Sequence, residues 1–168
     1  VGFMGYRIGC GLGERIAAIA SVTGTMNVNQ PATCSPSHPM PVMEIHGTAD
    51  ATVPYTGNIL FGTTPAAVAY WVNYNNCEPT PSITAIPDTD GGDGCTAEHQ
   101  VYTGGNNGST VEHFKIINGE HTWPGSAFGG VGTNQDIDAC KEIWRFFSQY
   151  DIHGLINTTS VEERIDPT

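Results

Sequence analysis

The sequence has few basic residues and little charge of either sign. Only 14% of its 168 residues are charged, and 6 Lys and Arg side chains against 17 Asp and Glu side chains give a net charge of −11. Such a chain repels phosphate backbones and anionic lipid headgroups, so we expect neither nucleic acid nor a membrane surface as a partner. It also lacks an apolar run approaching the roughly 18 residues that cross a bilayer. With 39% hydrophobic residues, it can still build the core of one soluble domain.

The five cysteines lack the CxxC and CxxxH spacings that indicate zinc sites. We expect two disulfides and one free thiol instead. Cys77 and Cys95 close a short loop rich in Pro, Gly and Asp, which has little core of its own and would gain from a cross-link. Cys10 and Cys34 are the second expected pair. Cys140 falls in a helical pattern and is expected to pack as a small apolar group. Disulfides favour a secreted protein, extracellular or periplasmic.

Apolar periodicity predicts an α/β domain over residues 1–153, followed by a linker or disordered tail over residues 154–168. Strands are expected at residues 16–22, 42–46, 83–86, 99–103 and 111–117, and helices over residues 1–15, 65–75 and 137–150. The glycine-rich segment 104–108 predicts a hairpin turn between the last two strands.

Two loops that follow strands carry candidate catalytic residues. His121 lies in Gly-Glu-His-Thr-Trp-Pro-Gly at residues 119–125, just after the strand at 111–117. A histidine on a loop held by a rigid strand is a common proton-transfer group. Asp50 follows the strand at 42–46, where an open parallel sheet presents functional side chains. The alternatives are a loop histidine and a turn aspartate without catalytic roles.

An acidic loop at residues 88–94 has the spacing of a calcium loop. It lacks the distal bidentate glutamate of the helix-loop-helix calcium motif. We therefore favour solvated turn residues over a calcium site, and we expect no metal and no cofactor.

Five segments taken together resemble a known group of esterases. They are MGYRIGC at residues 4–10, ERIAAIASVTGTM at 14–26, PVMEIHGTAD at 41–50 with VPY at 53–55, GEHTWPG at 119–125 and EIWRFF at 142–147. The group contains polyhydroxybutyrate depolymerases, feruloyl esterases and acetylxylan esterases, and the resemblance spans residues 1–150.

The resemblance implies the carboxyl-terminal portion of an α/β-hydrolase fold, a mostly parallel sheet flanked by helices. It implies a secreted carboxylic-ester hydrolase with a Ser-His-Asp triad, in which Asp50 is the acid and His121 the general base. Trp123 and Tyr55 would line the acyl or sugar side of the pocket. The expected substrate is a polyester, a feruloylated or acetylated polysaccharide, or a short-chain ester.

The family's serine nucleophile belongs to a G-x-S-x-G elbow directly before the helix that opens here at Gly2. We therefore expect the serine upstream of Val1, which stands where the elbow's last glycine would be. Ser21 and Ser126 are substitute candidates, although neither lies in an elbow. The unpaired strand at 17–22 predicts a homodimer or association with a missing amino-terminal half. The alternative function is a non-catalytic binding or assembly module on a degenerate hydrolase fold.

Overall fold

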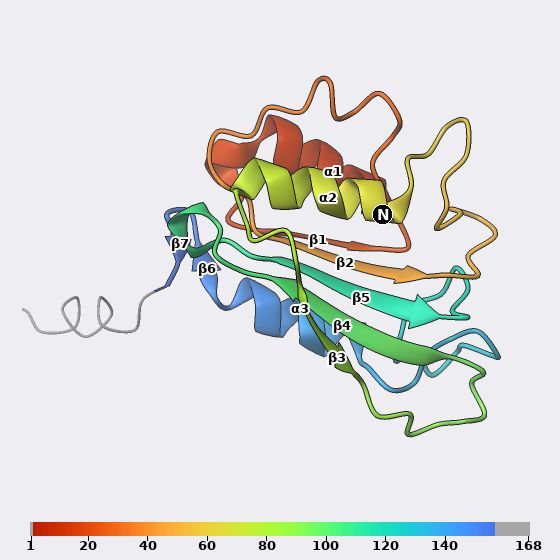
Figure 1. Cartoon of the computed structure of the whole chain (residues 1–168). Coiled ribbons are helices and arrows are strands. Elements are labelled where there is room, and N and C mark those ends of the chain that lie inside the picture. Colours follow the sequence, from red (N-terminus) through yellow and green to blue (C-terminus); the bar gives the residue numbers. More distant parts are fainter. Residues whose placement is uncertain (1, 157–168) are drawn as a thin grey trace, which may run out of the picture.

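The computed structural model describes residues 2–156. A five-stranded sheet is covered by helices α1 and α2 on one face and by α3 on the other (Figure 1). In chain order the elements are α1 (Gly2–Gly11), η1 (Gly13–Arg15), β1 (Ile19–Val22), β2 (Val42–Gly47), α2 (Thr64–Asn75), β3 (Ser82–Ala85), β4 (Thr96–Tyr102), η2 (Asn106–Gly108), β5 (Val111–Ile117), α3 (Ala139–Phe147), β6 (Tyr150–Asp151) and β7 (Gly154–Leu155). The predicted α/β class is confirmed.

The sheet has the order β1-β2-β5-β4-β3 and is mixed. β1–β2 and β2–β5 pair in parallel, whereas β5–β4 and β4–β3 pair antiparallel. The sheet is thus parallel only on the β1 side, and the expected mostly parallel sheet is too simple. The reason is the predicted turn at 104–108, with Gly104 and Gly108 at φ of +78° and +71°, because so short a connection can join only antiparallel neighbours.

β2 is the central strand that positions the site, and all its residues are buried. Side chains alternate across a strand, so Val42 faces the core beneath α1 and α2, while Met43 and Ile45 face the core beneath α3. Glu44 and His46 lie two and four residues after Val42 and therefore share the α1 and α2 face. A carboxylate and an imidazole are thus enclosed in an otherwise apolar layer.

β1 forms one edge of the sheet, as expected for the strand at 17–22. Ile19 and Val22 are nevertheless buried under the flanking helices, so the open edge consists of backbone groups rather than apolar side chains. At the other end of the chain, Gly154–Leu155 pairs with Tyr150–Asp151. The predicted tail therefore begins within a small hairpin, and its residues 157–168 lie outside the described residues.

The expected Cys77–Cys95 disulfide is wrong, since both thiols are free. Cys77 lies near the carboxyl end of β4, which is Tyr102. Its Sγ is 3.8 Å from the carbonyl oxygen of Ser109. Cys95 directly precedes β4 at the opposite end. The seven residues of that strand hold the two thiols apart by about 20 Å, far beyond the span of a disulfide. Nearness in sequence across a loop did not imply nearness in space.

The second expected disulfide, Cys10–Cys34, is confirmed. It joins the end of α1 to the segment before β2, and it is consistent with an oxidising compartment. Cys140 is free as expected, but it is exposed rather than packed in the core. Within residues 2–156, no helix is both long and apolar enough to cross a bilayer.

Removing the Cys10–Cys34 disulfide is expected to lower the free energy of unfolding by about 3 kcal/mol, because a cross-link between residues 24 apart restricts the unfolded chain. Denaturant unfolding of the double variant Cys10→Ser/Cys34→Ser measures this change. Cys140→Ser is the matched control, since it removes an exposed free thiol. Equal unfolding midpoints for the double variant and the control would contradict the prediction.

Candidate active site

Asp50 and His121 meet at the carboxyl ends of the neighbouring parallel strands β2 and β5. The two loops touch because Gly47 lets the backbones approach, as a Cβ on this residue would lie 2.1 Å from the carbonyl oxygen of Gly119. The amide of Ala49 donates to the same oxygen at 2.9 Å. The loop contact fixes the distance between the aspartate and the histidine.

The imidazole of His121 donates from Nδ1 to Oδ2 of Asp50 at 2.8 Å. Asp50 is buried, and its Oδ1 accepts two backbone hydrogen bonds, from Thr52 and Val53, each at 2.8 Å. The side chain of His121 is 39% exposed. Because Nδ1 holds the proton that it shares with the carboxylate, the Nε2 lone pair is directed away from Asp50 and is open to accept a proton.

A buried network extends from Asp50 to helix α1. His46 donates from Nε2 to the carbonyl oxygen of Val53 at 2.9 Å, and the same nitrogen lies 3.3 Å from Oδ2 of Asp50. Nδ1 of His46 shares a proton with Oε1 of Glu44 at 2.9 Å. The other carboxyl oxygen of Glu44 accepts from the Tyr6 hydroxyl at 2.5 Å. The aspartate that orients His121 is therefore itself oriented by groups with no access to water.

The electrostatics of this network follow from burial and pairing. Burial raises the pKa of Glu44, and it also raises that of Tyr6, where the Glu44 carboxylate adds to the effect. Burial alone would lower the pKa of His46, but the hydrogen bond and charge of Glu44 outweigh it and the pKa is raised. Glu44 and His46 therefore share a proton across the 2.9 Å contact between Oε1 and Nδ1.

Tyr55 lies on the same face of the sheet, and its ring packs edge-on against His46, but its hydroxyl hydrogen-bonds a different histidine. Its hydroxyl donates to Nε2 of His113 at 3.1 Å, and Nδ1 of His113 donates to the carbonyl oxygen of Glu44 at 3.1 Å. Burial raises the pKa of Tyr55 to about 12. Tyr55 and His113 line a cavity of about 280 Å³ beside α2, together with Lys115. The structure therefore places Tyr55 at a neighbouring cavity, without a hydrogen bond to His121.

Acid is expected to destabilise the fold through His113. Burial lowers its pKa from the usual 6.5 to about 4, so between these values the unfolded chain binds a proton that the folded chain does not. Stability is therefore complete above pH 6.5 and is lost as the pH falls towards 4, by about 3 kcal/mol in total. Unfolding free energies at several pH values, for the wild type and His113→Asn, measure this. Identical pH dependence in both proteins would contradict the assignment.

Trp123 lies two residues after His121, and its side chain is 42% exposed. It remains a candidate for contacting a substrate beside the imidazole. Ser126 forms a turn in the same loop, where its Oγ accepts from the amide of Phe128 at 3.3 Å. Ser21 is buried and donates to the carbonyl of Gly24 at 2.9 Å. Within the described residues, no serine hydroxyl is hydrogen-bonded to His121.

The acidic loop uses its carboxylates to hold its own backbone. Asp93 accepts from the amides of Cys95 at 2.6 Å and Gln135 at 2.7 Å, and Asp90 accepts from the amide of Gly92 at 3.1 Å. No group of three or more His, Cys, Asp and Glu side chains within residues 2–156 is arranged to hold a metal ion. These carboxylates act as turn-forming groups.

Sequence reasoning named Asp50 and His121, which the structure brings together, and it did not name Tyr6, Glu44 and His46, which lie behind them. The available signal was the pair of polar side chains at alternate positions of an apolar strand, Glu44 and His46, which must share one face. No family model and no curated protein matches this chain.

Proposed function

We propose that Asp50 and His121 are the acid and the general base of a secreted serine carboxylic-ester hydrolase. The hydrogen bond of 2.8 Å between Nδ1 of His121 and Oδ2 of Asp50 carries this proposal. It leaves the Nε2 lone pair directed away from Asp50, on a side chain that is 39% exposed. The substrate is a polyester, a feruloylated or acetylated polysaccharide, or a short-chain ester.

The chemistry needs no cofactor. Nε2 of His121 takes the proton of a serine hydroxyl while the hydroxyl oxygen attacks the acyl carbon, and the resulting imidazolium is stabilised by Asp50. His121 then returns the proton to the departing alcohol, which leaves an acyl-enzyme. A water molecule gives its proton to Nε2 and attacks the acyl carbon, and the serine leaves with that proton as the free acid forms.

We propose that the serine lies upstream of Val1, shortly before α1, in an α/β-hydrolase fold. Two features support this. The parallel strands β1, β2 and β5 carry helices on both faces (Figure 1). α1 begins close to the carboxyl end of β1, since a Cβ on Gly2 would lie 2.7 Å from Cα of Gly24. The start of α1 thus lies at the end of the sheet where the loops of Asp50 and His121 follow β2 and β5. The open side of β1 would accept a further strand, from a second copy or from an amino-terminal half.

The test uses a protein that contains this chain together with the serine proposed to precede it. We expect hydrolysis of p-nitrophenyl acetate and covalent labelling of one serine by an alkyl fluorophosphonate, which reacts with activated serines. Heat-unfolded protein, in which the serine is no longer activated, is the control. If the folded protein shows neither hydrolysis above background nor labelling, the proposal is wrong and the non-catalytic binding or assembly module is favoured.

A further inference from the structure

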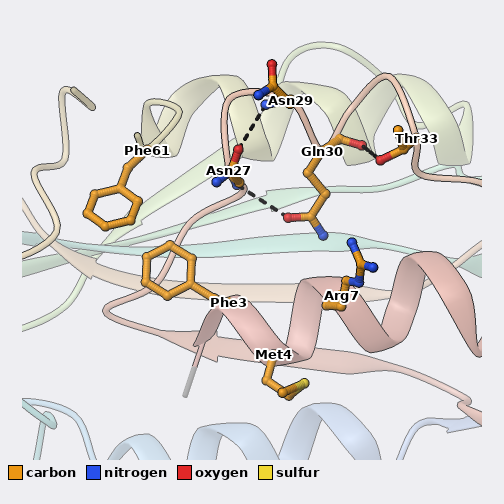
Figure 2. Close-up of a pocket in the computed structure, with 8 residues that line it drawn as sticks. All are labelled: Phe3, Met4, Arg7, Asn27, Asn29, Gln30, Thr33 and Phe61. Carbon is orange, nitrogen blue, oxygen red and sulfur yellow. Dashed lines mark hydrogen bonds between the residues drawn. The ribbon is translucent and has the colours of Figure 1, made fainter. Parts of the chain in front are cut away.

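A second cavity, with no catalytic pair, lies beside α1 and has a volume of about 460 Å³ (Figure 2). This is within the usual size range of small-molecule sites. We call it the Arg7 pocket, and it is lined by Phe3, Arg7, Asn27, Gln30, Thr33 and Phe61 among others.

The charge of the Arg7 pocket is opposite to that of the chain. The protein has 17 acidic and 6 basic side chains, yet among residues 2–156 the only charged side chain that lines this cavity is that of Arg7. Within residues 2–156, no carboxylate forms an ion pair with its guanidinium. The cavity is therefore a cationic site on an otherwise acidic protein, and it favours an anion.

Two groups of hydrogen-bond donors converge in the cavity. The guanidinium of Arg7 extends from α1 towards the side-chain amide of Gln30 (Figure 2). Gln30 is only 9% exposed. Its Oε1 accepts from the amide of Asn27 at 3.3 Å. Within residues 2–156, the one contact of its Nε2 is a weak hydrogen bond to Sγ of Cys10 at 3.6 Å. Two donor groups that face each other without an oxygen acceptor match a carboxylate, which accepts from both.

The other end of the cavity is apolar. The rings of Phe3 and Phe61 stack with centroids 4.9 Å apart (Figure 2), and both are only partly buried. An anion alone would leave these rings in water. A ligand that also carries an apolar body would cover them and gain free energy from the buried area.

The walls of the cavity are fixed before any ligand binds. The Cys10–Cys34 disulfide ties α1 to the segment that contains Gln30. An isolated β-bridge joins Asn27 to Phe61. Because Gln30 and the two rings are already held, these groups lose little conformational entropy on binding.

We propose that the Arg7 pocket binds a small organic carboxylate with an apolar body. Arg7 and Gln30 hold the carboxylate, and Phe3 and Phe61 contact the body. The proposal is independent of the ester-hydrolase function, because binding requires neither Asp50 nor His121.

Isothermal titration calorimetry with benzoate tests the proposal. Benzamide has nearly the same shape without the charge, and acetate has the charge without the body. Benzoate is expected to bind at least about tenfold more tightly than either, since a charged hydrogen bond and the apolar contact each contribute on the order of 1.4 kcal/mol or more. Equal affinities for benzoate and benzamide, or no saturable binding of benzoate at millimolar concentrations, would overturn it.

Variants locate the binding. Arg7→Gln is expected to weaken benzoate binding about tenfold, and Phe61→Ala to weaken it by a similar factor. Lys141→Gln removes the same charge from an exposed position on α3 and is expected to bind like the wild type. His121→Ala is also expected to bind normally, which separates this site from the catalytic proposal. Wild-type affinity in Arg7→Gln would refute the assignment.

Discussion

Replacing His121 by alanine in the protein that includes the proposed serine is expected to lower kcat/KM for p-nitrophenyl acetate by about 10⁴-fold or more, with the protein still folded. The imidazole is the group that accepts the nucleophile's proton, so the hydroxyl stays protonated without it. The side chain is 39% exposed, and its removal therefore leaves little unfilled space. Steady-state kinetics and a thermal melt of the same preparation measure both expectations.

Asp50→Asn tests the role assigned to the partner. An amide at this position can donate to Nδ1, which moves the imidazole proton to Nε2 and removes the lone pair that acts as the base. A loss of activity nearly as large as that of His121→Ala is expected. His153→Ala is the matched control, because His153 is an exposed histidine in the β6–β7 hairpin. A His121→Ala variant as active as this control would disprove the general-base role.

The sequence predicted the positions of the strands and helices better than their contacts and the pairing of the strands. β2, α2 and β5 were expected within a few residues of their observed bounds, because period and apolar runs are local signals. The prediction of a Cys77–Cys95 disulfide was wrong. A short loop appeared to bring the two residues together, but they lie at opposite ends of β4. The hairpin turn at residues 104–108 was predicted correctly. Its consequence, that β4 and β5 pair antiparallel and the sheet is mixed, was not drawn.

The site was predictable where backbone geometry required it. Asp50 and His121 each follow a strand and lie beside a glycine turn, and β2 and β5 proved to be parallel neighbours. The network behind them joins Tyr6 to Glu44 across a separation of 38 residues. No local sequence pattern indicates that contact. A carboxylate inside an apolar strand is energetically unfavourable unless it is hydrogen-bonded, and the sequence of the strand does not reveal its partners. For Tyr55 the limitation is different. The resemblance to the esterases singled out this residue but did not indicate that its hydroxyl hydrogen-bonds His113.

Glu44→Ala is expected to lower the free energy of unfolding by about 4 kcal/mol, which would be a large fraction of the stability of a domain of this size. The substitution removes the partner of His46 Nδ1 and of the Tyr6 hydroxyl, and both groups are fully buried. Neither can reach water to replace the lost hydrogen bond, and the cavity left by the carboxylate adds to the cost. Denaturant unfolding at neutral pH measures the change.

Glu44→Gln separates the hydrogen bonds from the charge. The amide keeps the shape of the side chain, and it can donate to Nδ1 of neutral His46 and accept from the Tyr6 hydroxyl, so a loss of only about 1 kcal/mol is expected. Tyr6→Phe removes one partner and should fall between the two variants. Equal stabilities for Glu44→Ala and Glu44→Gln would mean that hydrogen bonding within the network does not hold it together. The predicted order of stabilities would instead mean that hydrogen bonds hold the buried network together. The network then fixes the position of Asp50, and Asp50 fixes the orientation of His121.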